Sequence, residues 1–435
     1  VTDEYAQTAS YALEHSWTTV VNNYQFNPPP DDHINVYIMY MALYYGVTYI
    51  SYNPITGYHI KNITLSTNME YDLLRYVCAH EFFHTVQASY PITANWIMEG
   101  SEQWIIEGTA VWMGARVYPE YTGVVSFVYY ANEFLQNPDR ALTELDYDAV
   151  LFWIFLDEHY GGTDTIRNIM EQNESLNGIQ AVNATLNTLG TNFTQVFKEW
   201  TIANYLKDIY YSRGNLFNSI NAFQLIYDGT RIDVDDNVAD WGADYFEITS
   251  SVLYIPIQFI GQSHHNLTKI LMDHGTPLVS DFILHIPYAG SFWLMQANNL
   301  DKIIIIIRSL GNETNVDRYA YTLTLLSSSY TLNGPYELIS PQKTISTHYI
   351  TAENGNTVLI NVAKRISKQS SSYKTLNIPN SQSRQSSSQF TSSIANKKTA
   401  HSSLSKQITA VNNSTIVQSP ETIIEVQPIK PRASF

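Results

Sequence analysis

The sequence predicts an α+β protein in three parts, and three observations indicate this division. Within residues 1–240, a first helical segment is followed by strand-like runs and then by apolar residues at helical spacing, which is typical of a mixed sheet with helices. Residues 241–365 contain short β-branched and aromatic runs separated by turns, which is typical of an all-β sandwich. Residues 366–435 hold 17 serines and few aromatic residues, so we expect a disordered tail.

The first part is predicted to begin with a helix over 4–23, which Pro28, Pro29 and Pro30 separate from the next element because proline removes backbone donors. Residues 34–52 are dense in β-branched and aromatic side chains and predict one or two strands, with a candidate break at Gly46. A strand over 59–66 and a helix over 69–89 should follow. Further helices are expected over 104–116, 125–136, 147–160, 164–172 and 191–211.

The second part is predicted to consist of strands that begin after Trp241 and Gly242. Its longest apolar run, Ile303 to Ile307, has the length of a strand and is far shorter than the ~18 residues that a membrane span requires. The predicted strands cover 245–249, 251–259, 291–297, 302–310, 319–326 and 357–363.

The charge distribution and the cysteine content exclude several classes of function. The net charge of −16 divides into −22 for residues 1–365 and +6 for the remainder, and an acidic body argues against nucleic acid as a partner. Cys78 is the one cysteine, so the chain has no internal disulfide and no cysteine-based zinc knot. We interpret Cys78 as a small buried hydrophobic residue.

Two features favour an extracellular, glycosylated protein. The chain starts at Val1 without a signal segment, which is typical of a mature secreted chain. Charged residues are only 15% of the sequence, and eight Asn-x-Ser/Thr sequons occur although each one can arise by chance. The sequons are at Asn62, Asn173, Asn183, Asn192, Asn266, Asn312, Asn412 and Asn413.

The motif that carries chemistry is H-E-x-x-H, at His80, Glu81 and His84 on the helix predicted over 69–89. Histidines four residues apart lie on one face of a helix, so both imidazoles can bind one zinc ion. Glu81 lies about 100° further round, where a carboxylate can act as general base on an activated water. By composition, roughly 0.015 such motifs are expected by chance.

Catalytic zinc usually takes three protein ligands, and the third candidates are Glu99, Glu102 and Glu107. No histidine follows in the H-x-x-G-x-x-H pattern, so a glutamate remains. We favour Glu107, because apolar neighbours predict a buried helix in which a cation would offset the cost of its charge. Glu99 should lie in a loop, and Glu102 fits the first turn of that helix without a metal.

The segments CAHEFFHTVQ and WIIEGTAVWM resemble the gluzincin group of zinc metallopeptidases, and especially secreted bacterial and archaeal members with HEFFH followed by EGTA. The resemblance to this group covers roughly residues 4–250, and HEFFH and EGTA are its specific motifs. The resemblance implies a zincin-like catalytic domain, zinc, peptide-bond hydrolysis, His80 and His84 as ligands, Glu81 as base and Glu107 as third ligand. The chain departs from the pattern by a second Trp-x-x-Glu-Gly, at Trp96–Gly100.

Gluzincins also use a tyrosine or histidine to stabilise the oxyanion, and Tyr147 and His159 are the nearest candidates. Each also has an ordinary interpretation, as a packed tyrosine and as a histidine at a helix C-terminus. His264 and His265 are predicted to be exposed.

We therefore expect a secreted zinc metallopeptidase that acts on peptides or proteins. One alternative is an inactive zincin-fold surface or adhesion protein, whose β domain would contact glycan or the cell envelope. Another is zinc-assisted cleavage of an amide or ester in a non-protein substrate. The intact Glu81 favours an active enzyme.

Overall fold

The computed structural model describes residues 2–363, except 54–56, 91–101, 173–175, 177, 283–290, 298–299, 312–316, 330–336, 340–344 and 352–356. The tail expected over 366–435 and Glu99 lie outside the described residues. The helices and sheets confirm the α+β class. None of the described helices is long and apolar enough to cross a membrane.

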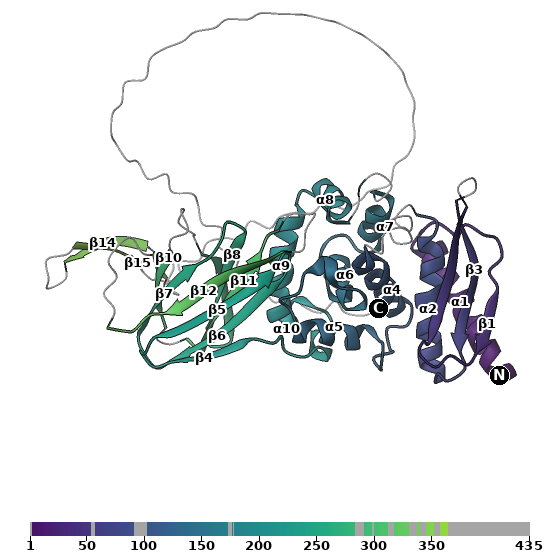
Figure 1. Ribbon diagram of the computed structural model, residues 1–435, viewed down its shortest axis with the longest axis horizontal. Coiled ribbons are helices and arrows are strands. Elements are labelled where there is room, and N and C mark those ends of the chain that lie inside the picture. The colour runs from purple at the N-terminus through teal and green to yellow at the C-terminus, as the bar shows by residue number, and fades with distance from the viewer. Residues whose placement is uncertain are drawn as a thin grey trace, which may run out of the picture. The chain divides into compact units, whose positions relative to one another are not determined.

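The chain begins with a helix and a three-stranded sheet (Figure 1). Sheet order is β1-β3-β2, with β1 parallel and β2 antiparallel to the central strand. The expected break at Gly46 is shifted, because residues 40–45 separate the strands and Gly46 begins β2. The elements are α1 (Asp3–Trp17), continued by a π-helix (Thr18–Asn23), β1 (Val36–Met39), β2 (Gly46–Asn53) and β3 (Gly57–Ser66).

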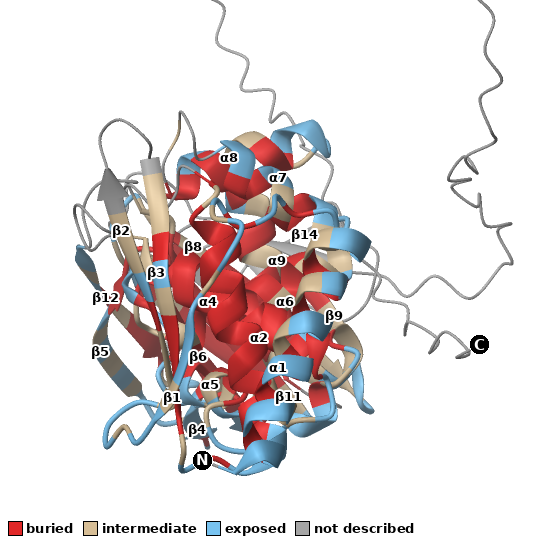
Figure 2. Ribbon diagram, turned by 90° about the vertical axis from the view of Figure 1, so that its right-hand side faces the viewer, coloured by how far each residue is buried: buried red, intermediate tan, exposed pale blue. Residues whose placement is uncertain are grey.

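Two helices, α2 (Tyr71–Gln87) and α4 (Gln103–Val117), are buried around nearly their whole circumference (Figure 2). The sheet and α1 contact α2, while α4 packs on it from another side. A Cβ on Gly114 would lie 2.9 Å from the Tyr76 ring of α2, so this glycine allows the two helices to approach closely. A Cβ on Gly108 of the same helix would instead lie 2.6 Å from Nε1 of Trp153.

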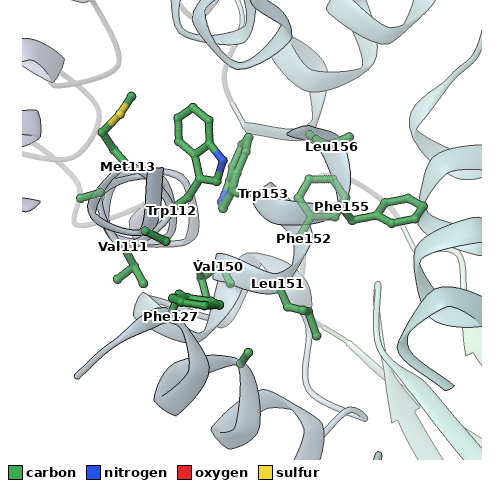
Figure 3. Packing of buried hydrophobic residues seen from close by; sticks show 14 of the residues in the cluster. Val111, Trp112, Met113, Phe127, Val150, Leu151, Phe152, Trp153, Phe155 and Leu156 are labelled. Atoms are coloured by element: carbon green, nitrogen blue, oxygen red, sulfur yellow. The ribbon is translucent and has the colours of Figure 1, made fainter. Parts of the chain in front are cut away.

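Further helices follow α4, and two of them, α5 (Phe127–Gln136) and α6 (Val150–His159), pack against it. Figure 3 shows Trp112 of α4 beside Trp153 of α6, and both residues belong to one apolar core with Phe152. Sequence analysis missed α8, whose asparagines and initial glycine are poor helix formers. These helices are α5 (Phe127–Gln136), α6 (Val150–His159), α7 (Thr163–Gln172), α8 (Gly178–Thr188), α9 (Phe193–Tyr205) and α10 (Lys207–Tyr210), with 3-10 turns at Leu142–Glu144, Tyr147–Ala149 and Gly214–Leu216.

Two five-stranded sheets follow, in the orders β13-β10-β7-β12-β5 and β4-β6-β11-β8-β9, together with a β14–β15 pair. They share one apolar core, and their strands begin at Phe223, earlier than the expected 241. The strands are β4 (Phe223–Tyr227), β5 (Ile232–Ala239), β6 (Ala243–Ser250), β7 (Tyr254–Ile260), β8 (His265–Asp273), β9 (Thr276–Asp281), β10 (Ser291–Gln296), β11 (Lys302–Ser309), β12 (Arg318–Leu325), β13 (Glu337–Ile339), β14 (Ile345–Thr351) and β15 (Thr357–Ala363).

The isoleucine run of β11 is buried on both faces of its sheet. Ile303, Ile305 and Ile307 belong to the core shared by the two sheets, whereas Ile304 and Ile306 belong to the core of the helices. Successive side chains of a strand point to opposite faces, so a strand covered on both sides has no polar alternation. The helical part and the sheets therefore share a continuous packed boundary.

Candidate metal centre

His80 and His84 come from α2 and lie one turn apart on the same face of that helix. Their Nε2 atoms are 3.1 Å apart, and the two rings meet nearly edge to face. Both side chains are buried, at 8% and 6% exposure. The i, i+4 spacing thus brings two imidazoles to one point, as the sequence predicts.

Glu107 reaches the same point from α4. Its Oε2 lies 3.3 Å from His80 Nε2 and 3.4 Å from His84 Nε2. One ligand atom from each of the three residues falls within a distance of 4.8 Å, so the group could hold a metal ion. Glu102 does not join them, because its carboxylate lies against Gly178.

The charges of this group stabilise one another. Burial alone would lower the pKa of His84, but the charge of Glu107 and the interaction of the imidazole N–H with its carboxylate raise that pKa to about 9. Burial would raise the pKa of Glu107, yet the imidazoles of His84 and His80 hold it well below its usual range. The carboxylate is therefore ionised although it is buried.

This donor set fits a divalent cation. The Glu107 oxygen faces two imidazole nitrogens at distances longer than a normal N–H···O hydrogen bond. A buried carboxylate without a short hydrogen bond is costly, and a cation between the three groups would remove that cost.

Gln87 holds His84 and joins the two helices. His84 Nδ1 lies 2.7 Å from Gln87 Oε1, while Gln87 Nε2 donates to the Ile106 carbonyl at 2.8 Å and to Thr109 Oγ1 at 2.9 Å. Because the amide nitrogen of Gln87 donates to a carbonyl, its oxygen accepts from the imidazole. When His84 binds a metal, the ring would keep its proton on Nδ1 and give up the one on Nε2, which leaves the Nε2 lone pair for the metal.

Glu81 is held from the side of the sheet. The Thr48 hydroxyl lies 2.7 Å from Glu81 Oε2 and 2.9 Å from the Glu81 carbonyl, so it donates to one of these oxygens at a time. A Cβ on Gly46 would lie 2.6 Å from Glu81 Oε1 and from Glu81 Cγ. Only glycine lets the start of β2 approach this carboxylate so closely.

The model of a family of unknown function, DUF6055, matches residues 5–250, more than half of the chain. The chain belongs to the DUF6055 family. Its matched region runs from α1 to the end of β6 and contains His80, Glu81, His84 and Glu107. Comparison with curated proteins gives no match.

Tyr147 also belongs to the matched region, and it lies next to His80 of the candidate metal centre. The Tyr147 ring is nearly parallel to that of His80, at a centroid distance of 5.8 Å, and the Tyr130 ring also stacks with it, at 4.9 Å. Burial and the charge of Glu107 raise the pKa of Tyr147, so the phenol stays protonated. It is therefore available as a hydrogen-bond donor.

His159 lies elsewhere. Its Nε2 is 2.9 Å from the Tyr210 carbonyl, and its ring packs on Phe155. The expectation that His265 is exposed is wrong, because this side chain is buried in the sandwich, where Gln262 N donates to its Nδ1. Of the two oxyanion candidates, the structure brings only Tyr147 next to a metal-centre residue.

Sequence analysis did not identify four residues that contact the candidate ligands, the Glu81 carboxylate or Tyr147. They are Gln87, Thr48, Gly46 and Tyr130. Gln87 had a local signal, since it lies three residues after His84 on the same helix and can reach its imidazole. The other three come from distant segments, so only the tertiary structure shows their contacts.

Proposed function

We propose that this protein is a zinc-dependent metallopeptidase. The observation that carries the proposal is the buried His80–His84–Glu107 group, with a glutamate adjacent to the first histidine in sequence. Two imidazoles and one carboxylate, with a further position left for water or substrate, are a usual donor set of catalytic zinc. The resemblance of HEFFH and EGTA to gluzincins supports the same conclusion.

The chemistry that zinc supplies, when bound, is polarisation of the scissile carbonyl and a lower pKa for the attacking water. Glu81 accepts the proton of that water and afterwards delivers it to the leaving amine nitrogen. Its own position is controlled by Thr48 and Gly46, which restrict the carboxylate from the side of β2. A base held in this way needs little reorientation between the two proton transfers.

Tyr147 is proposed to donate a hydrogen bond to the oxyanion that develops on the substrate carbonyl. Stacking contacts with the rings of His80 and Tyr130 restrict the position of the phenol. A donor fixed before the reaction stabilises developing charge more than a mobile one. The raised pKa of Tyr147, caused by burial and by Glu107, keeps the donor proton in place.

A polypeptide substrate is favoured by the position of β2. Among the described strands, β2 pairs only with β3, so its other edge is free to bind an extended chain. Gly46, at the start of this strand, lies directly against Glu81. A peptide bound along β2 would therefore pass close to the proposed base.

An extracellular location is part of the proposal. The sequons and the low content of charged residues support it. Asn192 is exposed and caps α9 by accepting a hydrogen bond from Gln195 N at 2.9 Å. The cap uses the side-chain oxygen of Asn192, so attachment of a glycan to its side-chain nitrogen would not remove this hydrogen bond.

The experiment that tests the function combines metal analysis with peptide cleavage by the full-length chain. We expect about one zinc per chain, and cleavage of casein or of a quenched peptide library that stops with 1,10-phenanthroline and returns with added zinc. Folded protein that binds no zinc would contradict the proposal. Protein that binds zinc without cleaving any peptide would favour the inactive surface protein or a non-protein substrate.

A further inference from the structure

A second candidate site lies on the other side of α4 from the metal centre. It is a cavity of about 330 Å³ between α4, α5, α6 and the turn after α10. Trp112 lines it and follows Glu107 by five residues, which corresponds to about 140° around the helix. The proposed peptidase chemistry uses none of the residues that line this cavity.

The first wall of the cavity carries a buried carboxylate. The Asp157 side chain is 9% exposed, and its Oδ2 accepts a hydrogen bond from Trp112 Nε1 at 3.1 Å. Arg116 Nη1 lies 3.5 Å from the same oxygen, and its guanidinium lies over the Tyr24 ring. Among the described residues, only this oxygen of Asp157 has a partner in the structure, so Oδ1 keeps its capacity to accept hydrogen bonds.

The second wall of the cavity also carries one carboxylate and one guanidinium, those of Glu158 and Arg213. Glu158 follows Asp157 on α6, and its two carboxylate oxygens accept from the backbone nitrogen and the hydroxyl of Ser212. The next residue, Arg213, donates to the Pro119 carbonyl through Nη2, and its Cζ lies 4.5 Å from the centre of the Phe127 ring. Among the described residues, Nε and Nη1 of Arg213 have no hydrogen-bond acceptor, so they can donate to a ligand.

Between the charged groups the lining is aromatic. Trp112 and Phe127, both labelled in Figure 3, are each 1% exposed, and Phe217 is 5% exposed. A ligand that fills this space must therefore offer an apolar group to these rings. The carboxylates of Asp157 and Glu158 can in addition receive a cationic group, and the guanidiniums of Arg116 and Arg213 an anionic group, so a ligand that carries both charges is complementary to this lining.

We propose that this cavity binds a small zwitterion with an apolar side chain, of the kind represented by a free aromatic amino acid. The ammonium group would bind at the Asp157 and Glu158 carboxylates, and the carboxylate at the guanidiniums. The cavity volume lies at the lower end of the range for small-molecule sites, which suits a ligand of this size. The proposal does not rest on peptidase activity.

The test is calorimetric titration of the full-length, metal-stripped chain with L-phenylalanine. We expect one site with a Kd of about 1 mM or tighter. N-acetyl-L-phenylalanine lacks the ammonium and L-phenylalaninamide lacks the carboxylate, so each should bind roughly tenfold more weakly or worse. Glu158→Gln and Arg213→Gln should each weaken L-phenylalanine binding by a similar factor.

Two controls separate this cavity from other sites. Arg75→Gln removes a partly exposed arginine that pairs with Asp72 and does not line the cavity, and Glu107→Gln alters the metal centre. Both variants should bind L-phenylalanine as the wild type does. The proposal is overturned if the wild type shows no saturable binding up to about 20 mM. It also fails if the cavity variants bind normally, if Glu107→Gln abolishes binding, or if maltose binds and L-phenylalanine does not.

Discussion

The metal centre and the sandwich both bury ionisable side chains, but they satisfy them in different ways. In the sandwich, the Tyr321 hydroxyl donates to Asp244 Oδ2 at 2.6 Å, and Arg308 donates to Asn266 at 2.6 Å and Thr268 at 3.0 Å. Asp244 and Arg308 each make a short hydrogen bond within the sandwich, although Nε and Nη2 of Arg308 have no partner among the described residues. At the metal centre, by contrast, three ligand atoms meet at one point without short contacts between Glu107 and the imidazoles.

This difference distinguishes a structural from a functional use of buried charge. A buried polar group that is fully hydrogen-bonded costs little and orients its neighbours. A carboxylate and two imidazoles directed at one point are complementary to a cation that the protein alone does not provide. Substitutions should therefore affect zinc and catalysis in the helical part, and only stability in the sandwich.

The largest effect is expected for Glu81→Gln. The amide keeps the shape of the side chain but cannot accept a proton, so turnover of a quenched peptide should fall by about 10²–10⁴-fold with zinc still bound. Glu133→Gln, on an exposed position of α5, is the matched control and should keep wild-type turnover. Unchanged turnover in Glu81→Gln would rule out this glutamate as the base.

Glu107→Ala should have the next largest effect, because it removes one of three ligands. Zinc at a thousandfold excess over its Kd stabilises the folded wild type by about 4 kcal/mol, and the variant should lose most of this gain. Denaturant unfolding with and without zinc measures the difference, and Asp244→Asn should keep the full gain. If Glu99→Ala loses the zinc effect and Glu107→Ala retains it, the ligand is the glutamate of the other Trp-x-x-Glu-Gly segment.

Gln87→Leu tests the residue that orients His84. The variant leaves His84 Nδ1 without its acceptor at 2.7 Å and also removes the donor to Ile106 and Thr109. Zinc affinity, measured by competition with a chelator, should fall by about 10–100-fold. Gln87→Glu preserves the acceptor and should keep a larger part of the affinity, whereas equal losses in both variants would point to the lost donor instead.

The sequence predicts the core of the metal centre because its geometry is local. His80 and His84 share one helix, so their spacing alone brings them together. Glu107 could be selected because its apolar neighbours predict a buried helix, which α4 is. The choice between Tyr147 and His159 required the fold, since it depends on how a 3-10 turn packs against α2 and α4.

In the sandwich, by contrast, the local sequence pattern does not predict every strand or which faces of the sheets are covered. The run Ile303–Ile307 predicts a strand, but not that the helices cover one face of its sheet. The β5 strand was missed because Asp233, Asp235 and Asp236 lower its β propensity. Two of these carboxylates accept hydrogen bonds from threonines of β12, a stabilisation that depends on cross-strand partners.

Asp244→Asn is expected to have the smallest effect, and this effect should depend on pH. Burial raises the pKa of Asp244 to about 7, although the hydrogen bond from Tyr321 acts in the opposite direction. The folded pKa exceeds the unfolded value of 3.8, so the stability that Asp244 contributes is fully present below about pH 4. It is lost as the pH rises to about 7, because the folded protein must then hold a buried charge.

Asparagine cannot ionise, and its side-chain oxygen can still accept the hydrogen bond from Tyr321. The variant should therefore resemble the wild type at pH 4 and be more stable at pH 8, by roughly 1–2 kcal/mol. Urea unfolding of both proteins across this range measures the difference, and the comparison cancels the titration of all other groups. A constant difference between pH 4 and pH 8 would mean that Asp244 ionises as easily in the fold as in the unfolded chain. The sandwich would then accommodate a buried charge without a counter-ion, and the contrast with the metal centre would not hold.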